Sequence, residues 1–258
     1  MEQSSVPRKH RSASRTPSRH KTYFFSDVHL GLGTPEEDRQ KEQRLIRFLD
    51  FIEKDAEQII IVGDLFDYWF EYKTVVPKGY FRLFAKLAEI HDRGIRVFFT
   101  VGNHDFWMRG YFHDELGMEV YTEPMEKEIH GKRFLIHHGD GLIKNDVGYR
   151  ILKKILRAKI NVFLFALIHP DLTGRIARWS SHTSRQYTSN RAYEGDDMVR
   201  FAQEKIRTGF DFVIMGHHHV PTIQQFLTGT YVNLGDWIFE NTYAVFDGKK
   251  MVLQQWKG

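Results

Sequence analysis

The first half of the chain alternates short apolar runs with longer segments of helical periodicity. The apolar runs end in polar residues and glycine, which predicts buried strands running into loops, in KTYFFSDVHLG (21–31), QIIIVGDLFD (58–67) and IRVFFTVGNHD (95–105). Apolar residues recur at helical spacing in 38–54 and 80–93, which predicts one helix after each of the first two strands. This β-α-β-α-β order predicts a parallel sheet with right-handed crossovers.

The second half of the chain is dominated by short apolar runs. Residues 127–140, KEIHGKRFLIHHGD, predict a hairpin that turns at Gly131-Lys132. From residue 210 onward the pattern predicts a series of short strands, beginning with FDFVIMGHHH. An α/β first half joined to a β-rich second half predicts two packed sheets with helices on the outside.

Residues 142–208, between the two halves, are predicted to be largely helical. The apolar positions that trace one face of this segment are Leu152, Ile155, Leu156, Phe163, Leu164 and Leu167. This pattern fits an ordinary helix that faces the core, which is the more frequent case, or a cap that holds an apolar or charged substrate. We therefore expect a tail over 1–21 and one domain over 22–258 that carries 142–208 as a helical insert.

Positive charge is concentrated at the N-terminus. Of the first 21 residues, six are Lys or Arg and one is Glu, whereas the remainder carries 31 basic and 32 acidic side chains. The tail is rich in Ser, Arg and Pro and poor in large apolar residues, which predicts disorder. Because the rest is nearly neutral, no nucleic-acid partner is expected. INVFLFALI (160–168), the nearest candidate for a membrane span, is too short to be one.

Polar side chains follow five of the predicted strands, at the point where each strand ends. The side chains that offer carboxylate, amide or imidazole groups are Asp27, His29, Asp64, Asn103, His104, Asp105, His138, His217 and His219. Ligands gather at the carboxyl ends of parallel strands, so these groups are expected to lie close together. In an extended segment residues i and i+2 point the same way, which predicts that Asp27 and His29 bind one ion. By the same argument His217 and His219 are predicted to be ligands, and His218 is predicted to point away from them.

These groups predict a metal site without sulfur, because the chain has no cysteine. Imidazole and carboxylate ligands suit Mn²⁺, Fe or Zn²⁺ better than Ca²⁺. The set exceeds what one tetrahedral ion needs, which predicts two ions that share a carboxylate and leave positions open for water and substrate. Such pairs, about 3.5–4 Å apart, serve displacement at phosphorus.

The five blocks SDVHLG, GDLFD, GNHD, HHGD and GHHH, in this order at strand ends, resemble those of the calcineurin-like metallophosphoesterases. The resemblance spans about residues 22–256. It implies a four-layer αββα sandwich of two packed mixed sheets, a helical cap insertion and two divalent ions, with Mn²⁺ preferred over Fe or Zn²⁺. By the family pattern the ligands of one ion are Asp27, His29, Asp64 and His219. Those of the other are Asp64, as the bridge, with Asn103, His138 and His217.

Within the family, these blocks together with HHGDGLIKNDVGYR and a helical insert are most similar to the pyrophosphatases of lipid A synthesis. That similarity implies hydrolysis of UDP-2,3-diacylglucosamine to lipid X and UMP through attack of a metal-held hydroxide on phosphorus. It also implies a cytoplasmic enzyme, peripheral to the inner face of the membrane through its cap, with no obligate protein partner. The substrate contacts expected are Asn103, His104, Asp146, Ser181 and Arg185.

One block departs from that group, whose well-known members have Gly-Asn-Arg-Asp where this chain has GNHD. We interpret His104 as a catalytic residue that protonates the leaving group or stabilises the transition state, with Asp105 orienting its ring. The departure leaves open a phosphatase or phosphodiesterase that acts on another soluble phosphoester or nucleotide. A binding module without catalysis is disfavoured because no metal position is missing. His137 is expected to be structural, and Asp140 either a turn residue or a partner of a metal ligand.

Overall fold

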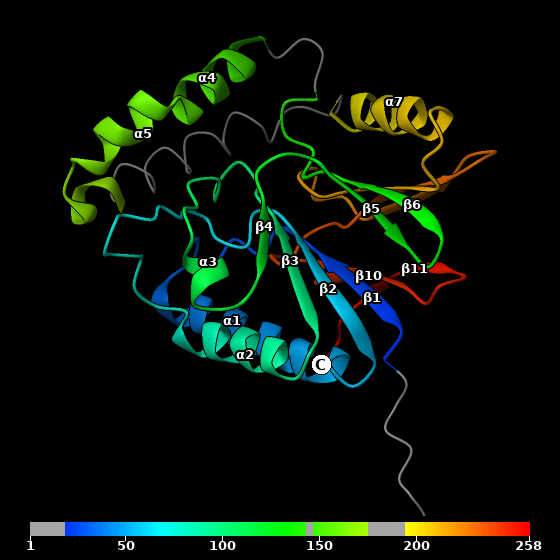
Figure 1. The fold of residues 1–258 in the computed structure, drawn as a ribbon, viewed down its shortest axis with the longest axis horizontal. Helices are drawn as coiled ribbons and strands as arrows, with labels where there is room; N and C mark the ends of the chain where they lie inside the picture. The colour runs from blue at the N-terminus through cyan, green and yellow to red at the C-terminus, as the bar shows by residue number, and fades with distance from the viewer. Residues whose placement is uncertain (1–18, 143–146, 175–193) are drawn as a thin grey trace, which may run out of the picture.

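The computed structural model describes residues 19–142, 147–174 and 194–258, and its strands form two sheets (Figure 1). In spatial order, the strands of the first sheet are β11 (Met251–Gln255), β10 (Thr242–Phe246), β1 (Lys21–Phe25), β2 (Ala56–Val62), β3 (Arg96–Thr100) and β4 (Glu119–Tyr121). β1, β2 and β3 run parallel, as the sequence predicts, and β4 joins them in parallel. β10 and β11 add antiparallel neighbours at the other edge.

The second sheet is also mixed. In spatial order, its strands are β5 (Met125–Ile129), β6 (Lys132–Ile136), β7 (Phe212–Met215), β9 (Thr230–Asn233) and β8 (Thr222–Gln225). The predicted hairpin is the β5–β6 pair, but its turn lies one residue earlier than predicted. His130 and Gly131 make the turn with φ of 50° and 74°, and Lys132 already pairs with Ile129. Positive φ at both central residues matches the twist of the flanking strands.

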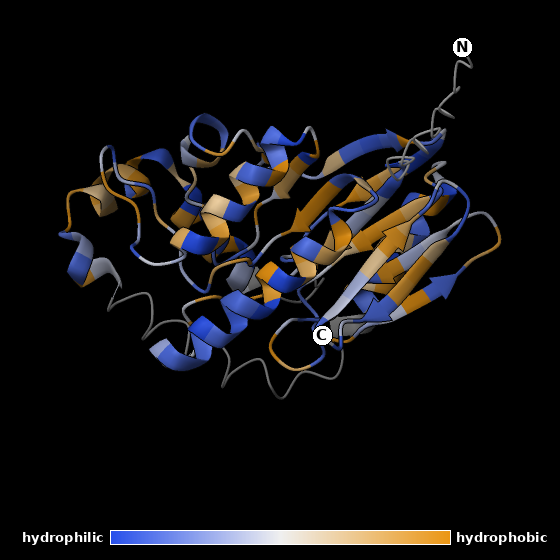
Figure 2. Cartoon of the chain, turned by 90° about the horizontal axis from the view of Figure 1, so that it is seen from below, coloured by the Kyte–Doolittle hydropathy of each residue, from blue (hydrophilic) through white to orange (hydrophobic). Residues whose placement is uncertain are grey.

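The two sheets pack face to face, and helices cover both outer faces (Figures 1 and 2). α1 (Pro35–Ile52) and α2 (Phe81–Asp92) bury their apolar faces against the first sheet, and α7 (Glu194–Arg207) covers the second. The core between the sheets includes Phe24, Ile60, Phe98, Phe134 and Ile214, all buried. This arrangement confirms the four-layer αββα sandwich.

Local sequence accounts for the start of α1. Thr34 accepts the N–H of Glu37, and the Glu37 carboxylate accepts the N–H of Thr34, so each satisfies a backbone group of the first turn. Pro35 occupies the first helical turn, where its missing N–H costs nothing. The helix leads away from the loop after β1, so its start helps to position that loop.

The insert contains a helical arm, residues 147–166, made of α4 (Val147–Arg157) and α5 (Lys159–Ala166). The arm extends beyond the sandwich (Figure 1), and many of its apolar side chains are exposed: Ile151, Leu152, Ile155, Ile160, Phe163 and Leu164. Ala158 separates the two helices with extended backbone. The interpretation as a core-facing helix is wrong, since these side chains face outward. In the part of the chain that the structure describes, every helix is too short or too polar to cross a membrane.

Aromatic contacts fix the arm to the sandwich. The indole of Trp107 stacks on Phe165 with ring centroids 4.9 Å apart, and its Nε1 donates to the carbonyl of Leu156 at 3.2 Å. Phe70 packs against the same Phe165 ring at 5.0 Å. The arm is therefore held next to the loops that follow β2 and β3.

Candidate metal centre

The predicted metal ligands come together at the carboxyl ends of the central strands, where the two sheets meet. Three groups place one nitrogen or oxygen of each member within 4.8 Å of the others. The groups are Asp27, His29 and His219; His29, Asp64 and His104; and Asp64, His138 and His217. Asp64 belongs to two groups, as a carboxylate that bridges two ions would.

The backbone reaches this arrangement through left-handed residues rather than through extended strand ends. Asp27 and His29 have φ of 54° and 48°, and His217 and His219 have φ of 67° and 59°. The members of each pair therefore do not converge by the alternation that the sequence analysis assumed. Strained backbone of this kind is typical of functional sites, where the surrounding fold compensates its cost.

Glycines make room for the ligands. A Cβ added at Gly63 would collide with the ring of His138, and one at Gly102 would collide with the carboxylate of Asp64. Gly63 also has φ of 81°, a conformation that glycine adopts without strain. Gly63 in GDLFD and Gly102 in GNHD therefore allow the backbone to lie close to the side chains of His138 and Asp64.

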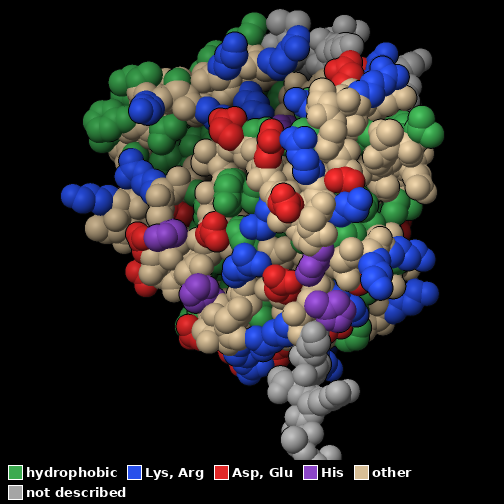
Figure 3. Space-filling model, turned by 45° about the vertical axis from the view of Figure 1, so that its right-hand side comes forward, with side chains coloured by type: hydrophobic (Ala, Val, Ile, Leu, Met, Phe, Trp, Pro, Cys, Tyr) green, Lys and Arg blue, Asp and Glu red, His purple; other side chains and the backbone are tan. Residues whose placement is uncertain are grey.

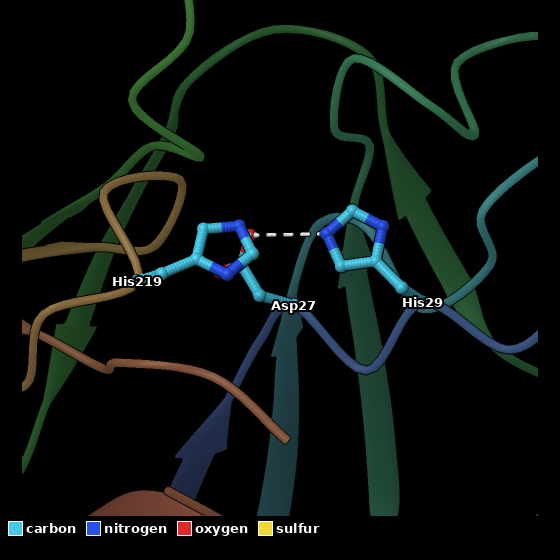
Figure 4. Close-up of side chains that lie close together, drawn as sticks. All are labelled: Asp27, His29 and His219. Carbon is cyan, nitrogen blue, oxygen red and sulfur yellow. Dashed lines mark ion pairs between the residues drawn. The ribbon is translucent and has the colours of Figure 1, made fainter. Parts of the chain in front are cut away.

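The first group surrounds the carboxylate of Asp27 (Figure 4). Nε2 of His29 lies 3.8 Å and Nε2 of His219 lies 3.4 Å from Oδ1 of Asp27. In the described chain this oxygen is buried and accepts no hydrogen bond, although the other oxygen accepts the N–H of His217 at 3.0 Å. A buried carboxylate oxygen without a donor is costly unless a cation compensates it.

The third group, Asp64 with His138 and His217, is built around Asp64. Nε2 of His138 lies 3.1 Å from Oδ2 of Asp64 and 3.1 Å from Oδ1 of Asn103. The other ring nitrogen of His138 lies 2.9 Å from the carbonyl of Val62, which fixes the orientation of the imidazole. His217 packs against this ring with centroids 5.1 Å apart. The four side chains expected to bind the second ion thus point at one place.

The electrostatics of the centre favour positive charge. Burial alone would lower the pKa of His138, but the carboxylates of Asp64 and Asp27 overcome it and raise that pKa to about 10. Burial opposes ionisation of Asp27 too, yet neighbouring His219 and His138 lower its pKa to about 2. The centre holds ionised carboxylates at a depth where they need cations. These residues fit two divalent cations in donor type, depth and geometry.

Two further carboxylates contact imidazoles that are predicted to bind metal, and neither carboxylate was predicted from the sequence. Nδ1 of His29 lies 3.3 Å from Oδ1 of Asp67, and Nδ1 of His219 lies 3.4 Å from Oδ2 of Asp236. Each leaves the Nε2 atom turned toward Asp27, an arrangement found around histidines that bind metals. Asp67 is the last residue of GDLFD, so its position was a usable signal, whereas Asp236 lies outside all five blocks.

His104 lies at the centre, but the role predicted for Asp105 is wrong. The Asp105 carboxylate accepts the backbone N–H groups of Gly102 and Leu65, each at 2.8 Å, and so joins the loops after β2 and β3. The His104 ring instead contacts Asp67, with Nδ1 3.0 Å from its carbonyl oxygen and 3.7 Å from Oδ1. Burial lowers the pKa of His104 to about 4, so its imidazole is neutral at pH 7.

The remaining residues singled out in the sequence divide into two sets. His137 accepts the N–H of Gly139 at 2.7 Å and packs against Phe201, which agrees with a structural role. Asp140 is buried and contacts the helical arm, with Nζ of Lys153 2.7 Å away. The predicted substrate residues Asp146, Ser181 and Arg185 lie outside the described residues.

An apolar cavity of about 540 Å³ lies beside the centre, between the loop after β2 and residues 170–174. Leu30, the residue after the predicted ligand His29, is among its lining residues. Most of the others are aromatic or aliphatic, and two are charged, Lys78 and Asp171. The aromatic and aliphatic ones include Tyr68, Phe70, Tyr72, Val75, Val76, Pro77 and Tyr80. Cavities of this size with apolar walls are typical of sites for small organic ligands.

Comparisons with known proteins identify the family of the chain. Residues 20–221 match the family model described as calcineurin-like phosphoesterase. The chain is 36% identical over 255 residues to the UDP-2,3-diacylglucosamine hydrolase of Porphyromonas gingivalis, covering 92% of this chain and 97% of that protein. It is 31% identical over 226 residues to the enzyme of the same name from Pseudomonas fluorescens, covering 83% and 86%. A solved archaeal phosphodiesterase aligns over 92% of this chain and 99% of its own, with 14% identity and a TM-score of 0.47.

Proposed function

Because the chain belongs to the calcineurin-like phosphoesterase family, we propose that it hydrolyses the pyrophosphate bond of UDP-2,3-diacylglucosamine, giving lipid X and UMP. The chain is a metal-dependent hydrolase, and relatives that align over nearly all of it carry the name of this activity. The observation that carries the proposal is that Asp64 belongs to two neighbouring groups of possible metal ligands. A carboxylate shared by two cations is suited to displacement at phosphorus.

We propose separate roles for the metal ligands and for His104. Asp27, His29, Asp64 and His219 would hold one ion, and Asp64, Asn103, His138 and His217 the other. Two divalent cations lower the pKa of water and neutralise charge that develops on phosphoryl oxygens. Nδ1 of His104 would donate to the carbonyl of Asp67, which orients the ring. Nε2 would donate to a phosphoryl or leaving-group oxygen once the negative charge of a bound phosphate favours protonation of the imidazole. We propose Mn²⁺ as the metal, with Fe or Zn²⁺ as alternatives that the same ligands accept.

The cavity beside Leu30 supports a substrate with an apolar portion. Its aromatic and aliphatic walls begin next to His29, so a substrate whose phosphate lies at the metals could place an acyl chain there. Burial of apolar surface contributes about 25 cal/mol for each Å² removed from water. Part of the affinity for a diacylated sugar would then come from this cavity.

The helical arm supports contact with a membrane surface, and we propose that it serves as a cap that faces the lipid. Figure 3 shows hydrophobic side chains gathered at the upper left of the molecule, the corner that the arm occupies in Figure 1, with Lys and Arg beside them. Phe163, Leu164 and Leu167 are each more than half exposed. Apolar side chains flanked by basic ones bind anionic bilayers at the interface. On this proposal the enzyme is cytoplasmic and peripheral to the inner membrane face.

The test is product analysis with the purified, Mn²⁺-loaded chain. UDP-2,3-diacylglucosamine is supplied in detergent micelles, and the products are identified by mass spectrometry. We expect UMP and 2,3-diacylglucosamine 1-phosphate in equal amounts, with ¹⁸O from labelled water in one of the two only. The Asp64→Ala variant serves as the blank for contaminating phosphatases.

A parallel assay with bis(p-nitrophenyl) phosphate addresses the remaining alternative, a phosphodiesterase for soluble esters. If this diester is cleaved and UDP-2,3-diacylglucosamine is not, the lipid substrate is wrong and the alternative stands. Membrane contact is measured separately by sedimentation with vesicles of phosphatidylglycerol and phosphatidylethanolamine. Loss of sedimentation in Phe163→Ser/Leu167→Ser is the result that the cap proposal requires.

A further inference from the structure

Asp140 joins the sandwich to the helical arm at the edge of the metal centre. It follows the metal-ligand His138 by two positions and is buried. Tyr149 donates its hydroxyl to Oδ2 of Asp140 at 3.1 Å, and Nζ of Lys153 lies 2.7 Å from the same oxygen. The third group is the guanidinium of Arg157, whose Nη2 is 3.9 Å away. Side chains four residues apart share one face of a helix, so α4 directs this face at the centre.

This face of α4 carries two positive charges, on Lys153 and Arg157, and both face the single negative charge of Asp140. Lys153 and Arg157 have side chains that are 24% and 25% exposed, so they are neither on the open surface nor closed off from solvent. One positive charge therefore remains beside the metal centre without a counter-charge from Asp140.

Arg157 is placed next to the loop that carries Asn103. Its Nη2 donates to the carbonyl of Gly102 at 3.3 Å, and its guanidinium lies over the ring of Phe106, 5.0 Å from the centroid. Within the described residues, Nε of Arg157 is buried and has no hydrogen-bond partner. A buried donor without an acceptor costs free energy that an anionic ligand oxygen would recover.

We propose that Lys153 and Arg157 form a subsite for the second phosphate of a pyrophosphate substrate, the phosphate that is not attacked. This inference rests on the proposed function, which places the attacked phosphate at the metals. The neighbouring phosphate also carries negative charge, and the α4 face presents two cations beside the loop that carries Asn103. Arginine and lysine both bind phosphate oxygens through charge-assisted hydrogen bonds. Asp140 acts as a positioning residue that keeps both cations in place before substrate arrives.

The kinetic test compares two substrates on the Mn²⁺-loaded enzyme. UDP-2,3-diacylglucosamine has two phosphates, and bis(p-nitrophenyl) phosphate has one. In Lys153→Met and Arg157→Met we expect KM for the pyrophosphate to rise roughly tenfold to a hundredfold, as for loss of a charged hydrogen bond. The loss for the single-phosphate diester should be smaller by about tenfold or more. Lys154→Met is the matched control, because Lys154 is the next residue along α4 and is exposed.

Equal losses on both substrates would mean that these residues only support the fold or the metals, and would overturn the proposal. No loss on the pyrophosphate would overturn it as well. If Arg157→Met melts much lower than the parent, Arg157→Lys replaces it. Arg157→Lys keeps the charge and lacks Nε, and it should show an intermediate rise in KM.

A binding measurement separates failure of this inference from failure of the proposed function. Inorganic pyrophosphate and orthophosphate are titrated calorimetrically into the Mn²⁺-loaded protein and its variants. We expect Arg157→Met to weaken pyrophosphate about tenfold more than orthophosphate. If wild-type protein does not turn over UDP-2,3-diacylglucosamine but this difference persists, the proposed substrate is wrong and the subsite stands. If turnover occurs and the difference is absent, the subsite is wrong.

Discussion

Nδ1 of His219 lies 3.4 Å from Oδ2 of Asp236, a buried carboxylate supplied by the loop after β9. The other oxygen of Asp236 accepts the backbone N–H groups of Ile238, Phe239 and Glu240, so the carboxylate is fixed on both sides. The contact orients the imidazole of His219, a predicted metal ligand. Asp236 itself lies beyond residues 20–221, which match the family model.

Asp236→Asn should weaken Mn²⁺ binding by about tenfold to a hundredfold, the range for losing a partner of a metal-ligand histidine. Asparagine keeps an oxygen for the three N–H groups, but its amide cannot accept from Nδ1 of His219. The measurement is calorimetric titration of the metal-free protein with Mn²⁺. Asp247→Asn is the matched control, because Asp247 accepts backbone N–H groups in a turn distant from the centre. Equal affinities in the two variants would contradict the role of Asp236.

Asp64→Ala should abolish turnover, with kcat reduced by at least about a thousandfold, because both ions lose a shared ligand. The bound metal should fall from two ions to one or none in elemental analysis of dialysed protein. A variant that keeps two ions and its turnover would show that the centre does not depend on a bridging carboxylate. Asp211→Ala, in which the altered carboxylate pairs with Lys132 away from the centre, controls for loss of an acidic side chain.

The sequence predicts which side chains gather at the centre, because each of them follows a strand within one short block. Asp64, for example, follows the end of β2 by two residues, so it lies at the edge of the sheet where the parallel strands end. The contact between Asp236 and His219 could not be predicted, because it depends on how the second sheet places β9 beside β7. The error over Asp105 has a similar cause. Adjacent residues were expected to contact each other, but Asp105 turns to the loop after β2 instead.

The helical arm shows a different limit. Periodicity identifies the apolar face of α4 and α5 but does not tell which way the face points. Leu152 and Phe163 are half exposed because the described sandwich has no element on that side of the arm. The break at Ala158 has no local signal in the sequence, because alanine is a good helix former.

His218 lies between two proposed ligands, and replacing it should leave the metals in place. Among the described residues it belongs to none of the three ligand groups, whereas His217 and His219 each belong to one. His218→Ala should retain two ions and a kcat/KM within about twofold of the parent. His217→Ala and His219→Ala should each lower Mn²⁺ affinity by at least about tenfold. Metal loss in His218→Ala comparable to that of its neighbours would reject this assignment.

Glu71 should contribute to stability rather than to chemistry. Its Oε2 accepts the N–H groups of Gly110 and Tyr111 at 2.8 and 3.2 Å, and Oε1 accepts Nε1 of Trp69 at 3.1 Å. Glu71→Gln places an amide donor opposite one of these donors, so we expect a loss of about 1–3 kcal/mol in the free energy of unfolding. Urea denaturation measures it, with the exposed Glu115→Gln as control. A loss no larger than that of the control would mean that this network is not stabilising.

Metal affinity should rise with pH because of one proton on His138. The pKa of His138 is raised to about 10 by Asp64 and Asp27, so the metal-free protein holds this proton at pH 7. The pKa of His217 is lowered to about 4 by burial and that of Asp27 to about 2, so neither holds a proton that Mn²⁺ must displace. Between about pH 7 and pH 10 the Mn²⁺ affinity should therefore increase about tenfold for each pH unit, with release of one proton. Calorimetry at pH 7 in two buffers of different ionisation enthalpy counts the protons, and a count of zero would show that His138 is already neutral.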